Sequence, residues 1–225
     1  MKKIAYYCQV DYKKNGKMKS FMFKEFLLKQ VVAKVKTQTR RTHGLEKVNH
    51  NPGRYKFQAL LPPITEKDQL YALFVDLENP STSALVSCKP KYQIGDICYL
   101  KENYAIAGNT THHHIYQADY DPEARKKIKW KSKLMMPAVS ARFKVQVTGI
   151  RVERLQDISE YDAIQEGIVN HWFCTKYYQC YLDVEGFYKQ AIDSFKSLWY
   201  FINGNDSWNK NPWVFVYEFK LIDNG

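Results

Sequence analysis

The sequence predicts an α+β fold built around a small mixed or barrel-like sheet. Several short segments alternate apolar and polar residues as strands do, and two or three others carry apolar residues at helical spacing. No regular βαβ succession or internal repeat links them, which argues against a parallel doubly wound sheet. With 225 residues, of which 45% are hydrophobic and 15% aromatic, the chain can form a packed core, so a disordered protein is excluded.

The first elements are a hairpin and a helix. Residues 3–10 alternate loosely as a strand, Lys14 to Lys17 form a turn, and residues 20–23 form the returning strand. A short amphipathic helix follows over residues 25–34. Its apolar face is formed by Leu27, Leu28, Val31, Val32 and Val35.

The middle of the chain shows less regularity. The Asn, Gly and Pro residues between Thr42 and Arg54 are typical of a loop. Residues 57–93 have no clean period and contain four prolines, so we expect a long, mostly irregular segment there.

Regular elements return in the second half. Strands are predicted at 97–101, within 141–152 and at 213–221. Ser159 is placed as the N-cap of a short helix that ends at Gly167, and a longer helix is predicted from 186 to 202. We assign three tryptophans to the core or its rim: Trp199, Trp208 and Trp213.

Positive charge is concentrated in two segments. Residues 1–56 carry 15 Lys and Arg against 3 Asp and Glu, and residues 124–144 carry eight basic side chains and no acid. If the segments meet in space, they form a positive face for a polyanion, bound with salt-dependent affinity. The alternative is a solvated surface that keeps the protein soluble.

Several classes of protein lack support. No window approaches the roughly 20 apolar residues of a membrane span, and the N-terminus does not have the pattern of a signal peptide. Five cysteines without a Cys-x-x-Cys pair argue against a disulfide framework or zinc ribbon, so we expect a cytoplasmic protein with free thiols. Nucleotide, serine-hydrolase and zincin motifs are missing, and we predict no cofactor and no metal site. His112, His113 and His114 are expected in an exposed loop.

Five strings in order resemble the phage and prophage branch of the ASCH domain family. They are KTQTRR at 36–41, GDICYLKE at 95–102, YQAD at 116–119, MPAVSAR at 136–142 with VTGIRVERLQDIS at 147–159, and NPWVFVYEF at 211–219. The resemblance implies a single domain over 18–222 with a PUA-like fold, a small curved mixed β-barrel flanked by helices. Residues 1–17 are then an N-terminal extension and the region around 57–85 an insertion. Lys34 stands where the family would have a glycine.

The resemblance also implies a ligand and a site. The cleft of such domains serves RNA, nucleosides or modified bases, and some members hydrolyse N4-acylated cytidines or cleave RNA. Lys36, Thr39 and Glu166 match the amidohydrolase residues. Chemically, a Lys near Arg40 and Arg41 can serve as the base that activates a Thr hydroxyl, with Glu166 as general acid or base. Positions 36 and 39 point to opposite faces of an extended segment, so this cooperation requires a turn.

Simpler alternatives stand beside each of these roles. Lys36 and Thr39 can equally belong to a phosphate-binding loop, and Glu166 can be an ordinary exposed helix carboxylate. Glu102 either accepts from an exocyclic amine such as cytosine N4 or makes a cross-strand ion pair. Tyr104 and Trp130 either stack on a base or pack. The remaining residues nominated for nucleic-acid or nucleobase binding are Arg40, Arg41, Lys126, Lys127, Lys129 and Arg142.

Two functions remain open from the sequence. One is a module that binds RNA or a modified nucleotide without turnover. The other is a hydrolase of N4-acylated cytidine, with RNA cleavage as a variant. We expect a phage- or prophage-encoded protein of the bacterial cytoplasm, whose oligomeric state the sequence leaves open.

Overall fold

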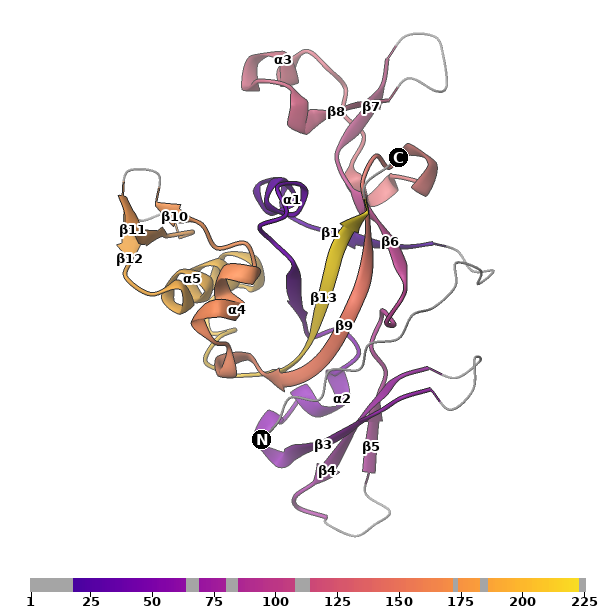
Figure 1. The fold of residues 1–225 in the computed structure, drawn as a ribbon, viewed down its shortest axis with the longest axis vertical. Helices are drawn as coiled ribbons and strands as arrows, with labels where there is room; N and C mark the ends of the chain where they lie inside the picture. The colour runs from indigo at the N-terminus through magenta and orange to yellow at the C-terminus, as the bar shows by residue number, and fades with distance from the viewer. Residues whose placement is uncertain are drawn as a thin grey trace.

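A computed structural model describes residues 18–63, 69–79, 85–107, 114–171, 174–182 and 186–222. Its centre is a five-stranded mixed sheet in the order β1-β6-β9-β13-β2 (Figure 1). The strands are β1 (Lys19–Met22), β6 (Ile97–Lys101), β9 (Lys144–Arg154), β13 (Trp213–Ile222) and β2 (Gln38–Arg41). β1 and β6 run parallel, and every other pairing in this sheet is antiparallel. The predicted α+β class is therefore confirmed.

The sheet is curved but open. β9 and β13 bend together along their whole paired length, and a register shift between Glu218 and Phe219 interrupts their ladder (Figure 1). Among the described residues, no backbone pairing joins the edge strands β1 and β2, so the sheet does not close as a barrel. A side chain spans the gap instead, because Arg41 of β2 donates to the carbonyl of Met22 in β1 at 3.2 Å.

The core lies against the inner strands of this sheet. β13 contributes four consecutive buried residues, Val214 to Tyr217, because its two faces pack against different layers. Phe21 of β1 stacks on Tyr92 with ring centroids 4.0 Å apart, and Tyr92 makes an edge contact with Tyr217. Burying each such ring stabilises the fold by roughly 1.5–3 kcal/mol.

Helices cover the sheet where the periodicity predicts them. α1 (Glu25–Val32) buries Leu27, Leu28 and Val31. α4 (Glu160–Gln165) begins at Ser159, whose hydroxyl accepts from the amide of Asp162, as predicted. α5 (Ala191–Asn203) starts later than expected, because β12 (Phe187–Tyr188) takes the residues before it. Glu160 then caps α5 by accepting from the amide of Ala191 at 2.7 Å.

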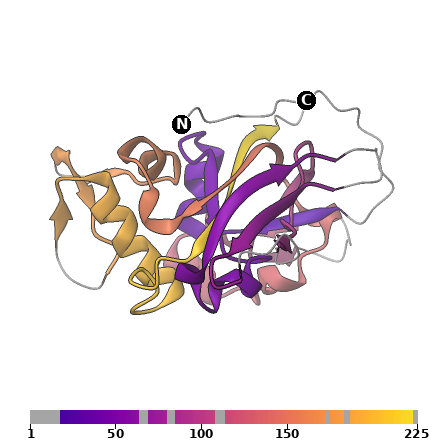
Figure 2. The same cartoon turned by 90° about the horizontal axis from the view of Figure 1, so that it is seen from below.

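The expectation of an irregular segment over 57–93 is wrong. β3 (Tyr55–Leu61), β4 (Tyr71–Asp76) and β5 (Leu85–Cys88) form an antiparallel sheet of three strands, seen from below in Figure 2. Pro62 directly follows β3 and Pro90 follows β5, so these prolines lie beyond strand ends and interrupt no ladder. The loop expected over 42–54 likewise contains α2 (Glu46–Asn49) and a 3-10 turn at Pro52–Arg54.

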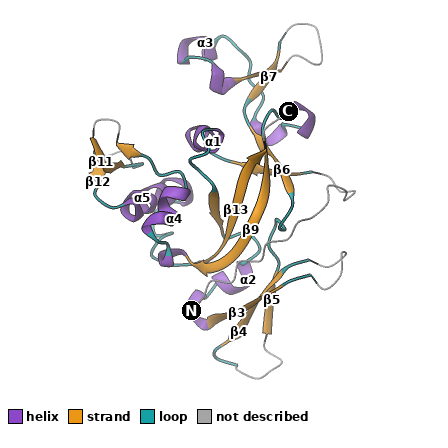
Figure 3. Cartoon of the chain, in the orientation of Figure 1, coloured by secondary structure: helices purple, strands orange, loops and turns teal. Residues whose placement is uncertain are grey.

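Smaller elements complete the fold (Figure 3). β7 (Tyr104–Ile106) pairs with β8 (His114–Tyr116), and α3 (Pro122–Lys126) follows them. β10 (Asn170–His171) and β11 (Cys174–Gln179) join β12 in a second three-stranded sheet. The strand expected at 3–10 lies outside the described residues, as do His112 and His113. In the described part of the chain, no helix is long and apolar enough to cross a membrane.

Gly44 is required by its backbone. Its φ is +91°, and a Cβ placed there would lie 2.3 Å from the carbonyl oxygen of Lys89. We expect Gly44→Ala to lower the free energy of unfolding by about 2 kcal/mol or more, because backbone atoms must move. Urea denaturation measures the change.

Gly53→Ala is the matched control, since the nearest atom to a Cβ there is the Asn51 side-chain oxygen at 4.0 Å. Its effect should stay within about 0.5 kcal/mol. Equal stabilities of the two variants would contradict the conclusion that position 44 requires glycine.

Candidate functional site

Two cations of the KTQTRR segment, Lys36 and Arg40, contact one buried carboxylate, Glu166. Two residues after α1 ends, Lys34 has φ +60°, the left-handed conformation that favours glycine, and the chain then leads into β2. Lys36 Nζ lies 2.7 Å from Glu166 Oε2, and Arg40 Nη1 lies 3.0 Å from Glu166 Oε1. All three residues are at most 3% exposed. The alternatives of a surface loop for Lys36 and an exposed carboxylate for Glu166 are therefore wrong.

A network of charges extends from Lys36, Arg40 and Glu166 along the face of the sheet that α4 covers. Arg40 also binds Glu153 of β9, and Arg151 of β9 binds Asp162 of α4 at 2.9 Å. Arg151 reaches Glu218 of β13 at 2.6 Å. Each buried carboxylate therefore has a guanidinium or ammonium partner, as burial of charge requires.

Burial shifts the acidities within this network. Desolvation lowers the pKa of the Lys36 ammonium, and Glu166 opposes the shift by stabilising the charged form. For Asp162, desolvation alone would raise the pKa, but Arg151 and Arg40 outweigh it and the pKa is lowered. Burial thus favours the neutral form of Lys36, whereas its contact with Glu166 favours the charged form.

Thr39 lies apart from that pair. It belongs to the extended strand β2, opposite Tyr217 of β13, and is 3% exposed. Gln38 and Arg40 both contact α4 residues, so alternation places Thr39 on the other face of the strand. Cooperation between Lys36 and Thr39 requires a turn between them, whereas the turn in the structure is at Lys34, before both residues. Within the described residues, the Thr39 hydroxyl has no hydrogen bond to Lys36 or Glu166.

A basic recess opens where β1 and β2 fail to pair. Its volume is about 870 Å³, including space open to solvent. Among the described residues its lining includes no Asp or Glu. Arg41 lies over the Phe23 ring at 5.4 Å, and burial lowers the pKa of its guanidinium. The lining residues are Ser20, Met22, Arg41, His43, Lys91, Tyr92, Lys101, Leu134 and Tyr217.

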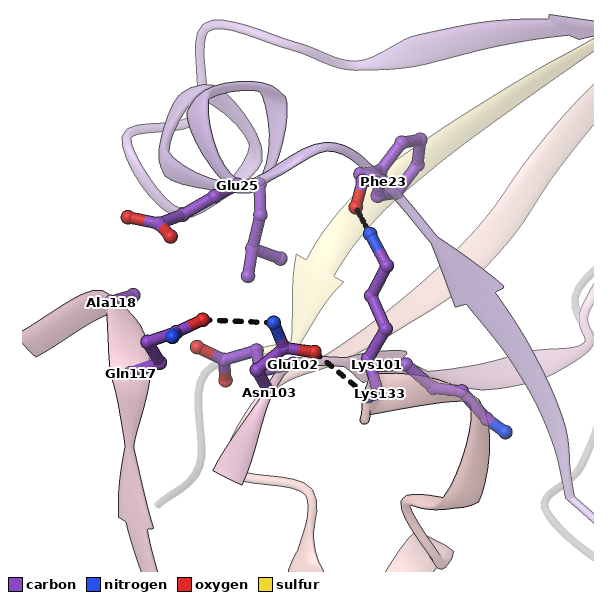
Figure 4. Close-up of a pocket in the computed structure, with 9 residues that line it drawn as sticks. Phe23, Glu25, Lys101, Glu102, Asn103, Gln117, Ala118 and Lys133 are labelled. Atoms are coloured by element: carbon purple, nitrogen blue, oxygen red, sulfur yellow. Dashed lines mark hydrogen bonds between the residues drawn. The ribbon is translucent and has the colours of Figure 1, made fainter. Parts of the chain in front are cut away.

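A second hollow, of about 300 Å³ including space open to solvent, is shown in Figure 4. We call it the Glu102 recess. Lys101 lines both recesses. Asn103 Nδ2 donates to Gln117 Oε1 at 2.8 Å, and Lys133 Nζ donates to the Phe23 carbonyl at 2.7 Å. The lining residues are Phe23, Glu25, Leu28, Lys101, Glu102, Asn103, Gln117, Ala118 and Lys133.

Glu102 is held by Arg142, which supports the ion-pair alternative for its role. Arg142 Nη2 and Nε lie 2.8 and 3.0 Å from the two carboxylate oxygens, and the same guanidinium binds Asp119. The guanidinium also stacks over the Tyr116 ring at 4.1 Å. This fixes the carboxylate beside the amides of the Glu102 recess.

The aromatic candidates divide between packing and partial exposure. Tyr104 is 5% exposed and pairs with Tyr116 across β7 and β8, so it is a packing residue. Trp130 is half-buried, donates its indole N–H to the Arg125 carbonyl and contacts the Tyr120 ring. Trp199 and Trp208 are buried, as predicted.

The two basic segments do meet. Arg125 binds Glu25 of α1 at 2.7 Å, and Leu134 lines the recess that holds Arg41. The exposed residues Lys126, Lys127 and Lys129 lie on α3 and the chain after it, where Lys126 pairs with Glu123. These three lysines line neither recess.

Sequence reasoning missed several residues of the two recesses. They are His43, Lys91, Tyr92, Lys101, Asn103, Gln117 and Lys133. The GDICYLKE and YQAD strings contain Lys101 and Gln117, so position within a family motif was the available signal. Lys91 carried no such signal. In the described chain, no cluster of three His, Cys, Asp or Glu side chains is placed to hold a metal ion.

Glu166→Gln should destabilise the protein strongly. The change leaves the buried cations of Lys36 and Arg40 facing a neutral amide, which costs of order 3 kcal/mol. Thermal and urea unfolding measure it. Glu123→Gln, which removes an exposed ion pair with Lys126, should cost less than about 1 kcal/mol. A Glu166→Gln protein as stable as this control would show that the carboxylate is not the anchor of the cluster.

Comparison of the chain with protein-family models, curated proteins and solved structures gives no match. The resemblance to the ASCH family consequently stands on the five sequence strings, and the ligand it implies is taken up below as a proposal.

Proposed function

We propose that this chain binds RNA, or a modified nucleotide, with phosphates in the basic recess and a base edge in the Glu102 recess. The observation that carries the proposal is the lining of the basic recess. Four of its residues are basic, namely Arg41, His43, Lys91 and Lys101, and acids are missing among its described residues. Such a site attracts phosphate, because its described lining has positive side chains and no carboxylate that would repel an anion.

The Glu102 recess suits the edge of a base. A carboxylate accepts from an exocyclic amine, and the amides of Asn103 and Gln117 both donate and accept. Lys101 is shared by the two recesses, which allows one nucleotide to occupy both. The nucleobase ligands that the ASCH resemblance implies belong to the same class of ligand.

Removing charge from the basic recess should weaken RNA binding. We expect Lys91→Gln with Lys101→Gln to reduce affinity. The slope of log affinity against log salt should fall by roughly 0.7 for each phosphate of a single strand that the variant no longer neutralises. Fluorescence anisotropy of a labelled oligonucleotide over a salt series measures both quantities.

Lys56→Gln with Lys189→Gln removes the same charge from exposed lysines that line neither recess. If this control weakens binding as much as the recess variant, the affinity comes from net charge and the proposed site is wrong.

Hydrolysis of an N4-acylated cytidine is a second candidate. One observation favours it. Lys36, three residues before Thr39 in the sequence, is buried, has a lowered pKa and donates a hydrogen bond to Glu166. Because Thr39 makes no hydrogen bond to Lys36 or Glu166 among the described residues, its proton would have to reach one of them through a water molecule. The Thr39 oxygen then bonds to the acyl carbon as the C–N4 bond breaks. The leaving N4 receives the proton, and water then hydrolyses the acyl ester.

An assay on N4-acetylcytidine tests this candidate. Thr39→Ala should abolish deacetylation, and Thr39→Ser should retain part of it, because serine keeps the hydroxyl. A short RNA incubated in parallel detects strand cleavage. Full activity of Thr39→Ala would remove Thr39 as the nucleophile, and no turnover by the wild type would leave the chain as a binding protein.

A further inference from the structure

An apolar loop projects beside the two recesses. In residues 132–140, three large apolar side chains face solvent: Leu134 is 64%, Met135 75% and Val139 86% exposed. They belong to two 3-10 turns, Lys133–Met135 and Ala138–Ser140. Exposed apolar side chains gathered on one short loop indicate a contact surface.

The loop is fixed to the fold at several points. Met136, between the two turns, is 1% exposed, and its carbonyl accepts from the Tyr99 hydroxyl. The amide of Lys133 donates to Asn103 Oδ1 at 2.8 Å, and Tyr116 donates to the carbonyl of Ser140 at 2.9 Å. The apolar tips are therefore presented by a preorganised backbone, which lowers the entropy cost of contact.

The first turn of the loop stands between the recesses. Lys133 lines the Glu102 recess, and the next residue, Leu134, lines the basic recess. Lys101, which lines both, donates to the carbonyl of Leu134 at 2.8 Å. The exposed apolar turn thus lies at the boundary between the basic recess and the Glu102 recess.

We infer that the three exposed apolar side chains of this loop form a wedge that enters a base stack of double-stranded nucleic acid. The inference rests on the proposed function, because the phosphates beside the opened step would bind the basic recess. Apolar side chains of this kind separate neighbouring bases, and the displaced base then needs polar groups for its exposed edge. Gln117 lines the hollow next to the wedge, together with Glu102, which Arg142 holds, and Asn103, which accepts from the Lys133 amide.

The recess favours nucleic acid over an anionic membrane as the partner. Tyr92 and Tyr217 of the basic recess are buried, at 5% and 0% exposure. A lipid surface would meet the projecting loop, but the charges that would bind a headgroup line a hollow, which the phosphate of a nucleotide can enter. The lysines near the loop could bind either nucleic acid or an anionic membrane, so the experiment tests both ligands.

The test uses a duplex RNA that contains 2-aminopurine, whose fluorescence rises when the base is unstacked. We expect the wild-type protein at saturation to raise the fluorescence and Met135→Ser with Val139→Ser, the two loop side chains that line neither recess, to lose most of the rise. Both side chains are exposed, so the variant should fold. Leu77→Ser with Leu85→Ser is the matched control, because these leucines are 52% and 46% exposed and line neither recess.

Anisotropy on the same duplex separates the two hypotheses. Retained binding with a lost fluorescence rise in the loop variant supports the wedge. Binding by the wild type without a rise, or an unchanged rise in the loop variant, overturns the wedge while the proposed function stands. No binding by the wild type to any nucleic acid overturns the proposed function itself. Loop-dependent binding to phosphatidylserine vesicles, with no unstacking, overturns the wedge in favour of a membrane.

Discussion

The Glu166 carboxylate balances two cations that β2 and the turn before it place out of contact with water. Lys36 binds one oxygen of this carboxylate and Arg40 the other, and Glu166 is the C-cap of α4. Because an unpaired buried charge is strongly unfavourable, the position of α4 on the sheet depends on this contact. Gly167 makes the approach feasible, since its φ is +90° and a Cβ there would lie 3.0 Å from Lys36 Cβ. Lys36, the candidate base of the hydrolytic mechanism, therefore also has a structural role.

The proposed binding surface lies where the central sheet stays open. β1 and β2 are both edges, and the gap between them is lined by side chains from segments far apart in sequence, such as Met22, Arg41, Lys91 and Leu134. A fully closed barrel would replace this gap with a backbone ladder. The Glu102 recess adjoins the gap through Lys101, so polar groups of different kinds lie within reach of one extended ligand.

Local pattern was sufficient where the period was clean. Apolar spacing predicts the helix at 25–34 and the sequence also predicts strands at 97–101 and 213–221, and α1, β6 and β13 confirm all three. The sheet over 55–88 was missed because its prolines were interpreted as breaks and its pairing partners are separated by long connections. The contact of Lys36 with Glu166 joins residues 130 positions apart, so only the family motif suggested it. Burial of Tyr104 and the recess position of Lys91 depend on tertiary packing, which no local pattern encodes.

The place of β13 in the sheet has a consequence for synthesis of the chain. β13 lies between β9 and β2, yet it is the last of the described elements to leave the ribosome. Until it emerges, β2 has no neighbour in the sheet and β9 has a free edge on the side that β13 will occupy. Unpaired strand edges of this kind recruit other chains. A nascent chain of this protein therefore carries an aggregation-prone intermediate until its final strand is available, and translation stalled before residue 213 would prolong that state.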